Sequence, residues 1–338
     1  MPRSRAPGTA PSAPTRPRLV LIGTGGTIAA TAGDARTLTG YQVTQGIEAM
    51  LAAIPGATDV ADIRCEQPFN VDSRDLSTAQ VLRLARQAER HLRDPDVDAV
   101  VITHGTDSLE ETAFFLHLTV RSPKPVVLIG AMRPASALSA DGPLNLVNAL
   151  LTAAHPASRD RGVLVVLNDR IIAARHAAKR HTTRVDAFGA DGAGVLGAVT
   201  DGRVRYAARP ELPETAPFDL SGLRALPPVD IILDYQDAPL HPYSAALQAG
   251  SRGLVVAAMG NGSLSPAAVR GCAQAIRRGL VCIRASRVPD GLVTDDAAHA
   301  NGPLAAHALN PLQARIALRL ALARGMDRAE IAELLRRL

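Results

Sequence analysis

The chain has 338 residues, of which 47% are hydrophobic and 20% charged, a composition typical of a globular protein with a substantial core. It contains no tryptophan and only 3% aromatic residues, so that core must be aliphatic. Four arginines in residues 1–18 supply most of the net charge of +5 and leave the remaining chain near +1, which argues against a nucleic-acid-binding surface.

The composition also argues against a metal site, a cofactor and a membrane partner. The three cysteines cannot form a fully paired disulfide framework, and the nine histidines show no ligand motif such as H-E-x-x-H. Residues 1–18 predict a disordered tail rich in proline and arginine, without the continuous apolar stretch of a secretory signal. No stretch reaches the roughly 18 apolar residues of a transmembrane helix. We therefore expect a cytoplasmic protein, or a periplasmic one if a signal peptide has been removed.

Through residues 19–208, apolar runs of strand length alternate with helical patterns. Strands are expected at residues 19–23, 99–103, 126–129 and 162–167, and helices at residues 77–92, 109–120 and 143–154. The helix at residues 77–92 opens with Ser77 and Gln80 in capping-box spacing, and Pro143 stands at the start of the helix at residues 143–154. This succession predicts a parallel sheet with helices on both faces, where ligands bind at the carboxyl ends of the strands.

A proline-rich segment, residues 209–228, has the composition of a linker. A second alternation follows it, with strands expected at residues 229–233, 253–257 and 280–284, and helices at residues 243–249, 266–277, 311–323 and 327–337. We therefore expect an α/β fold of two three-layer domains. The larger N-terminal parallel-sheet domain spans residues 19–208, and the smaller C-terminal domain spans residues 229–338.

The first strand ends in the sequence T-G-G-T-I-A at residues 24–29. A dinucleotide-binding G-x-G-x-x-G loop is not matched, because Ile28 occupies the third glycine position. Glycines in such a turn let the backbone approach a ligand closely, although a tight turn without function is the simplest interpretation of this segment alone. A hydroxyl such as that of Thr27 can instead be a nucleophile if a base or a cation lies nearby.

The next strand, residues 99–103, ends in H-G-T-D at residues 104–107. Asp107 or Ser108 can be the N-cap of the following helix. Even so, Thr106 places a second threonine, with an acid beside it, at the carboxyl end of a second strand. His104 invites assignment as a base, but a histidine at an apolar strand end is more often a packed structural residue.

With these motifs in order, the sequence resembles the bacterial two-domain L-asparaginases over nearly its whole length after the tail. The matching stretches are T-G-G-T-I-A at residues 24–29, H-G-T-D with E-E-T at residues 104–112, and residues 125–134, 139–145, 161–169 and 260–262. The resemblance implies an enzyme that hydrolyses the side-chain amide of L-asparagine to L-aspartate and ammonia, with L-glutamine as a secondary substrate.

The resemblance also assigns roles to residues. It implies that Thr27 attacks the amide carbon and that Tyr41 assists it and shields the site. On the opposite side, Lys179 lowers the proton affinity of Thr106, and Asp107 receives the α-ammonium group. Without the resemblance, Lys179 would be interpreted as a surface lysine in a basic stretch. The implied substrate-binding residues are Gly26, Ser73, Arg74, Thr106, Asp107 and Ser263, with Ser73 holding the α-carboxylate and the glycine-rich turn supplying N–H donors for the oxyanion.

Three positions depart from the family or vary within it. Arg74 stands where relatives commonly carry Gln or Glu, so its charge would repel an ammonium group unless the side chain turns away. Ala298 falls in register with a glutamate that relatives send to the neighbouring subunit, which leaves Asp295 or Asp296 as substitutes. Ser263 matches a position that is Asn or Ser, the Ser form accompanying more glutaminase activity. Because the last two positions act on a neighbour, the resemblance implies a homotetramer built from intimate dimers.

Several alternatives stay open at this point. An amidohydrolase of the same fold with a shifted amide substrate is favoured by Arg74. Direct attack by Thr27 and activation of a water by Thr106 are both compatible with the motifs. A nucleotide-binding oxidoreductase would explain the strand alternation and the glycine loop, and a non-catalytic amino-acid-binding protein would bind aspartate without turnover.

Overall fold

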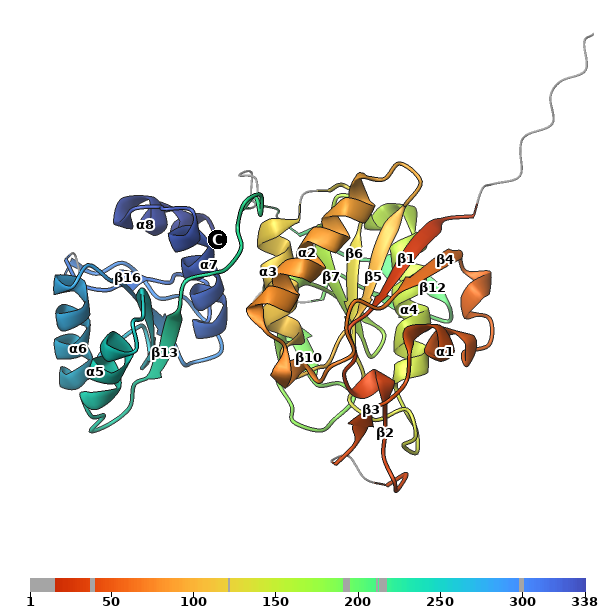
Figure 1. The fold of residues 1–338 in the computed structure, drawn as a ribbon, viewed down its shortest axis with the longest axis horizontal. Helices are drawn as coiled ribbons and strands as arrows, with labels where there is room; N and C mark the ends of the chain where they lie inside the picture. The colour runs from red at the N-terminus through yellow and green to blue at the C-terminus, as the bar shows by residue number, and fades with distance from the viewer. Residues whose placement is uncertain are drawn as a thin grey trace, which may run out of the picture.

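The computed structural model describes residues 16–36, 40–120, 122–190, 195–210, 212, 218–297 and 301–338. Ala298, most of the expected N-terminal tail and part of the expected linker lie outside these residues. Figure 1 shows two α/β domains, each with helices packed against a sheet. In the part of the chain that is described, no helix is both long enough and apolar enough to cross a membrane.

The N-terminal domain is built on an eight-stranded sheet. Its strands are β1 Arg18–Gly23, β4 Asp62–Glu66, β5 Ala99–Thr103, β6 Val126–Ile129, β7 Val163–Leu167, β8 Arg170–Ala173, β11 Gly197–Thr200 and β12 Arg203–Tyr206, in the spatial order β12-β11-β8-β7-β6-β5-β1-β4. The strands from β4 to β7 are parallel, and every residue of β5, β6 and β7 is buried, as expected of a sheet covered on both faces. The antiparallel strands β8, β11 and β12 extend this sheet and were not predicted.

Helices cover both faces of this sheet. They are α1 Ile47–Ala52, α2 Thr78–Arg93, α3 Leu109–Thr119 and α4 Gly142–Ala154. Helices α2 and α3 pack on one face, and α1 and α4 on the other (Figure 1). The sequence predictions for α2, α3 and α4 are confirmed, including the capping box of Ser77 and Gln80 and the proline in the first turn of α4.

Short elements complete the N-terminal domain. They are the hairpin of β2 Ala30–Thr31 and β3 Gln42–Val43, the hairpin of β9 Ala177–Lys179 and β10 Phe188–Ala190, and the 3₁₀ turns η1 Thr27–Ala29, η2 Ala57–Asp59, η3 Ser73–Asp75, η4 Pro156–Ser158 and η5 Ala174–His176. None of them has a hydrophobic period long enough to be predicted from the sequence.

The C-terminal domain has a four-stranded parallel sheet. Its strands, in spatial order, are β13 Val229–Leu233, β14 Gly253–Ala258, β15 Val281–Ser286 and β16 Leu304–Ala305, and its helices are α5 His241–Gln248, α6 Pro266–Arg277, α7 Pro311–Ala323 and α8 Arg328–Arg337. Helices α5 and α6 pack on one face with Tyr243, whereas α7 packs on the other. Helix α7 also contacts α3, so one apolar cluster continues from one domain into the other. The expected fold of two three-layer α/β domains is confirmed, while the exact boundaries at residues 208 and 229 stay a prediction.

Candidate active site

Three loop segments meet at the carboxyl ends of β1 and β5. The two strands are neighbours, with Gly23 opposite Thr103, so the residues that follow them emerge side by side. The segment before η3 joins them, because the Gly26 N–H donates to the Val71 carbonyl at 3.0 Å and the Val71 N–H donates to the Thr24 carbonyl at 3.0 Å. The fold therefore gathers the T-G-G-T motif, the H-G-T-D motif and the stretch around Ser73 at one edge of the sheet, as ligand sites in parallel sheets require.

Glycines make this close meeting sterically possible. Gly26 has a φ of +84°, and a Cβ on it would lie 2.3 Å from the Cα of Gly105. A Cβ on Gly25, whose φ is +104°, would lie 2.4 Å from the Val71 carbonyl oxygen. Only glycine adopts this backbone without strain and leaves room for the neighbouring chain. The Gly26 N–H, which the motif suggested as an oxyanion donor, is already bonded to Val71.

Thr27 begins the 3₁₀ turn η1 and is 6% exposed. Its hydroxyl donates a hydrogen bond to the phenolic oxygen of Tyr41 at 2.9 Å. Tyr41 lies just before β3, in the loop that follows the turn, and is only partly buried. The structure thus pairs the two residues expected to act together on one side of the site.

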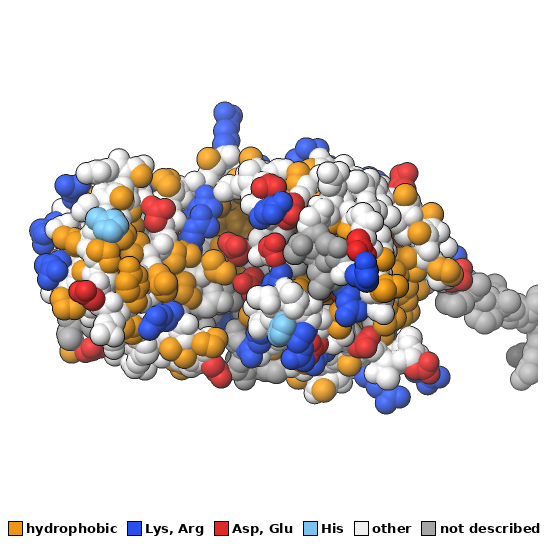
Figure 2. All heavy atoms as spheres, turned by 90° about the horizontal axis from the view of Figure 1, so that it is seen from below, with side chains coloured by type: hydrophobic (Ala, Val, Ile, Leu, Met, Phe, Trp, Pro, Cys, Tyr) orange, Lys and Arg blue, Asp and Glu red, His pale blue; other side chains and the backbone are white. Residues whose placement is uncertain are grey.

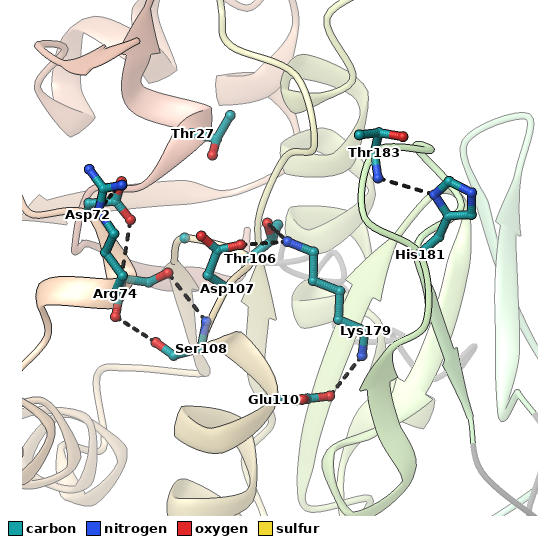
Figure 3. Close-up of polar contacts among 12 residues, drawn as sticks. Thr27, Asp72, Arg74, Thr106, Asp107, Ser108, Glu110, Lys179, His181 and Thr183 are labelled. Carbon is teal, nitrogen blue, oxygen red and sulfur yellow. Dashed lines mark hydrogen bonds and ion pairs between the residues drawn. The ribbon is translucent and has the colours of Figure 1, made fainter. Parts of the chain in front are cut away.

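Thr106, Asp107 and Lys179 form a second cluster, drawn in Figure 3. The Lys179 ammonium donates to the Thr106 hydroxyl at 3.0 Å and to Asp107 Oδ1 at 2.6 Å. Thr106 is 4% exposed, and the side chain of Lys179 is 18% exposed, so water screens this contact only weakly. An ammonium group held this way stabilises negative charge on the threonine oxygen and so lowers its affinity for a proton.

Glu110, a residue of the E-E-T stretch for which no role was predicted, fixes the position of Lys179. Its Oε2 atom accepts the backbone N–H of Lys179 at 2.7 Å, and burial raises the pKa of the Glu110 carboxyl above its usual value. The contact ties helix α3 to strand β9, from which the lysine side chain extends toward Thr106 (Figure 3). A carboxylate one helical turn after Asp107 was the only signal in the sequence.

The loop after β6 is held by a further pair of residues with no predicted role. Asp141 accepts the backbone N–H groups of Met132 and Arg133 at 3.0 and 2.9 Å, and the Asn145 amide donates to the Gly130 carbonyl at 3.0 Å. A Cβ on Gly130 would lie 3.0 Å from the Thr106 methyl group, so this loop packs directly behind the second threonine. The stretch S-A-D-G-P-L-N therefore supports the site from behind.

Ser73 opens the 3₁₀ turn η3 and is 5% exposed. Its hydroxyl oxygen accepts the N–H of Ser108 at 3.3 Å, and the Ser108 hydroxyl donates to the Ser73 carbonyl at 2.8 Å. A Cβ on Gly105 would lie 2.6 Å from the Ser73 hydroxyl oxygen, which shows how closely the two segments approach. The Ser73 O–H group is thereby placed beside the H-G-T-D motif, where it can donate to a ligand.

Arg74 turns toward acidic neighbours. Its Nε atom lies 3.5 Å from Asp72 and 3.8 Å from Asp75, and the side chain is 72% exposed. In Figure 3 its guanidinium group lies beside Asp72, on the side of Asp107 away from Lys179. The repulsion that the sequence suggested is therefore offset by two carboxylates and by solvent.

His104 is buried and does not act as a base for Thr106 in this geometry. Its Nδ1 atom lies 2.7 Å from the carbonyl oxygen of Gly105, and burial lowers the pKa of the ring to about 4. The imidazole is therefore neutral near neutral pH. This agrees with the structural role favoured by its position at an apolar strand end.

The predicted site residues of the C-terminal domain have their described contacts within that domain. Ser263 exchanges backbone hydrogen bonds with Met259 at 3.1 and 2.7 Å after strand β14. Asp295 lies 3.4 Å from Arg336 and 3.9 Å from His307. Asp296 is close enough to Arg284 to oppose the lowering of its pKa by burial. None of the described contacts of Ser263 and Asp295 reaches the two threonines, and Ala298 lies outside the described residues.

Among the residues that the structure describes, no group of three or more His, Cys, Asp or Glu side chains could hold a metal ion. The site brings together the hydroxyls of Thr27, Tyr41 and Thr106 with the ammonium group of Lys179 and the carboxylate of Asp107.

Comparison with known proteins places this geometry in a family. Residues 18–212 match the model of the asparaginase N-terminal domain, and residues 228–335 match that of the glutaminase/asparaginase C-terminal domain. The chain is 42% identical to L-asparaginase 2 of Escherichia coli over 94% of its length and 92% of the relative. It is 38% identical to a glutaminase-asparaginase of Pseudomonas aeruginosa, over 93% of this chain and 88% of the relative.

Among solved structures, the chain resembles that of a probable cytoplasmic L-asparaginase from Campylobacter jejuni. The TM-score is 0.92 at 39% identity, over 96% of this chain and all of the other. Since the two family models together cover most of the sequence and the fold agrees, the chain belongs to the asparaginase family.

Proposed function

We propose that this protein hydrolyses the side-chain amide of L-asparagine to L-aspartate and ammonia, with L-glutamine as a secondary substrate. The observation that carries the proposal is the pair of threonines at neighbouring strand ends, each bonded to a group that can handle its proton. Thr27 is bonded to Tyr41, and Thr106 to Lys179. Family membership and the activities named for the Escherichia coli and Pseudomonas aeruginosa relatives support the same reaction.

In the proposed mechanism Thr27 is the nucleophile. Its oxygen forms a bond to the amide carbon while its proton leaves along the hydrogen bond to Tyr41. The carbon–nitrogen bond of the tetrahedral intermediate then breaks, and the nitrogen departs as ammonia with the proton that left Thr27 and that Tyr41 relays to it. A water molecule hydrolyses the resulting acyl-threonine, which restores the Thr27 hydroxyl and releases L-aspartate. The Lys179 ammonium stabilises negative charge at Thr106 on the opposite side of the site.

The substrate's own charges have matching groups. Asp107 gives one carboxylate oxygen to Lys179 and has a second oxygen that can accept the α-ammonium group. Its side chain is 53% exposed, so a ligand can reach it. Ser73 can donate its O–H to the α-carboxylate while accepting from Ser108. One acid and one hydroxyl a short distance apart select an α-amino acid.

We also propose that the protein forms a homotetramer and lies in the cytoplasm. A homotetramer of intimate dimers would bring Ser263 and either Asp295 or Asp296 of one subunit to the site of another. Support comes from the resemblance, which implies that these positions act on a neighbouring subunit. A cytoplasmic location has the support of the Campylobacter jejuni protein, which is described as cytoplasmic.

Ammonia release from L-asparagine, L-glutamine and D-asparagine tests the proposal. We expect the highest kcat/KM for L-asparagine and a loss of at least about 10³-fold, or about 4 kcal/mol, in Thr27→Ala. The matched control is Thr200→Ala, since Thr200 is exposed at the end of β11 and should leave the rate unchanged. Full activity of the Thr27 variant would refute its role as nucleophile, and no release from any of the three amides would refute the reaction.

An amidohydrolase with a shifted amide substrate is the second candidate, and Arg74 is the observation that favours it. The same assay separates the two, because a shifted enzyme would release ammonia from another amide faster than from L-asparagine. The contacts of Arg74 with Asp72 and Asp75 favour asparagine, since they turn its charge away from the ammonium position.

A further inference from the structure

A pocket lies between the two domains, directly beside the candidate active site. It has a volume of about 300 Å³, and its lining includes Ser73, Arg74 and Asp107 but neither Thr27, Thr106 nor Lys179. Its other walls come from helices α2, α3 and α7 and from the segment that leads into β13. Figure 2 shows basic and acidic side chains gathered along the line where the domains meet. The pocket therefore adjoins the reactive threonines and shares Ser73 and Asp107 with the candidate active site.

Two opposite charges in the lining of this pocket approach each other without a close hydrogen bond. Nη1 of Arg315, on α7, lies 4.0 Å from Oε2 of Glu111, on α3, at the outer limit of an ion pair. Both side chains are about one-third exposed, at 31% and 32%. Arg315 is anchored by donating its Nε–H to the Val229 carbonyl at 2.9 Å, and its side chain lines the pocket.

A second arginine of the pocket, Arg319, holds the two domains together. Arg319 donates to the Pro227 carbonyl at 3.0 Å and to the Thr78 hydroxyl at 3.1 Å, so it joins α7 to the linker and to α2. Burial lowers the pKa of Arg319 to about 10. It adds positive charge to the wall of the pocket while its bonds hold the domain junction together. Arg315 and Glu111 are thus the pair positioned to receive a ligand.

One part of the wall is apolar. Phe115 of α3, Ile316 of α7 and Leu226 before β13 line the same pocket. A cavity of about 300 Å³ that combines an apolar patch with charged side chains of both signs has the size of a small-molecule site and suits a zwitterionic ligand.

We propose that this pocket binds an α-amino acid with an apolar side chain, its carboxylate on Arg315 and its ammonium on Glu111. Such a ligand would replace one loose ion pair by two charge-assisted hydrogen-bonded contacts without changing the net charge of the pocket. Its side chain would cover Phe115 and Ile316. An anion without an ammonium group would leave Glu111 facing a second negative charge, and an amine without a carboxylate would leave Arg315 unsatisfied.

Occupation of this pocket is coupled to the proposed reaction through shared segments. Ser73 and Ser108 line the pocket and are hydrogen-bonded to each other, and Asp107 belongs to both sites. The ligand should therefore change KM for asparagine more than kcat. This coupling rests on the proposed function, whereas binding of the ligand does not.

Calorimetric titration of L-norvaline into the full chain tests the inference. We expect Arg315→Gln and Glu111→Gln each to weaken binding at least about ten-fold, as loss of a hydrogen bond to a charged group requires. The matched control is Arg224→Gln, an exposed arginine outside the pocket, which should bind as wild type does. Butyrate and n-butylamine, each carrying one of the two charges, should bind at least about ten-fold more weakly than norvaline.

Equal norvaline affinity in all four proteins would overturn the inference, because binding would then take place elsewhere, including at the substrate site. No binding to the wild type would overturn it as well. If Arg315→Gln loses its thermal unfolding transition, Glu111→Gln decides the outcome alone. Ammonia release measured without norvaline should be unchanged in both variants. Its absence in the wild type would refute the proposed reaction and leave the binding result standing.

Discussion

The two halves of the expected site are built very differently. In the N-terminal domain, three segments are joined by backbone hydrogen bonds and by contacts that only glycine permits, and they place Thr27, Thr106 and Ser73 together. In the C-terminal domain, Ser263 and Asp295 have their described contacts with residues of their own domain. One chain therefore assembles the reactive groups itself, and in the proposed assembly the C-terminal residues would adjust the site of a neighbouring subunit.

The largest expected effect on activity comes from comparing variants of Thr106 and Lys179 with a variant of Ser263. Thr106→Ala and Lys179→Met should each lower kcat/KM for asparagine by about 10²- to 10⁴-fold, because each removes one partner of the hydrogen bond that stabilises charge opposite Thr27. Ser263→Ala should change kcat/KM by less than about ten-fold, with the effect mainly on the ratio of asparagine to glutamine hydrolysis. Steady-state kinetics on both substrates measure this. Equal losses in all three variants would contradict the division between reactive and adjusting residues.

The next test concerns the glycines that allow the segments to meet. Gly26→Ala should lower activity by at least about ten-fold and destabilise the fold by about 1–3 kcal/mol, because a Cβ there would lie 2.3 Å from the Gly105 backbone at a φ of +84°. The matched control is Gly33→Ala, since Gly33 has nothing within 4 Å of an added Cβ and no positive φ. Thermal unfolding and kinetics of both variants provide the comparison. A Gly26 variant as stable and active as the control would show that the close approach has no role.

The contrast also explains what the sequence could predict. Long buried strands such as β5 and periodic helices such as α2 were predicted within a residue or two, because their hydrophobic patterns are strong. The β8, β11 and β12 extension of the sheet was missed, since its short antiparallel strands depend on tertiary pairing.

Within the site, the resemblance predicted residues that the fold brings together, such as Thr106 and Lys179, although they lie 73 positions apart. It gave no role to Glu110, which acts through the backbone N–H of another residue. A carboxylate that bonds to a distant peptide group leaves no pattern in a single sequence. Nor could the sequence predict that the Gly26 N–H is bonded to Val71, because that bond depends on how β1 and the loop before η3 pack.

A smaller effect is expected at Glu110, which positions Lys179. In Glu110→Gln a side-chain oxygen still accepts the Lys179 N–H, so activity should stay within about five-fold, whereas Glu110→Ala should lose more. Burial raises the pKa of the Glu110 carboxyl, so this group holds its proton more tightly in the folded protein than in the unfolded chain. The charged carboxylate therefore lowers the free energy of unfolding as the pH rises above the pKa that Glu110 has in the unfolded chain. Thermal unfolding should thus show Glu110→Gln to be at least as stable as wild type at pH 8, with its relative advantage shrinking as the pH falls below the usual carboxyl range. If the stability of Glu110→Gln relative to wild type were lower at pH 8 than at pH 4, the predicted pH dependence would be wrong.

The smallest effect is expected at Arg74, where the N-terminal half departs most from the family. Its guanidinium group is mostly exposed and faces Asp72 and Asp75, so its field at the ammonium position is offset by these carboxylates and screened by salt. Arg74→Gln should therefore lower KM for asparagine by only about two- to three-fold, with kcat unchanged and the difference smaller at high ionic strength. Measuring KM for both proteins at low and high salt tests this. A decrease of ten-fold or more that persists at high salt would mean that Arg74 turns into the site when the substrate binds, and that this position, not the C-terminal domain, sets the affinity for asparagine.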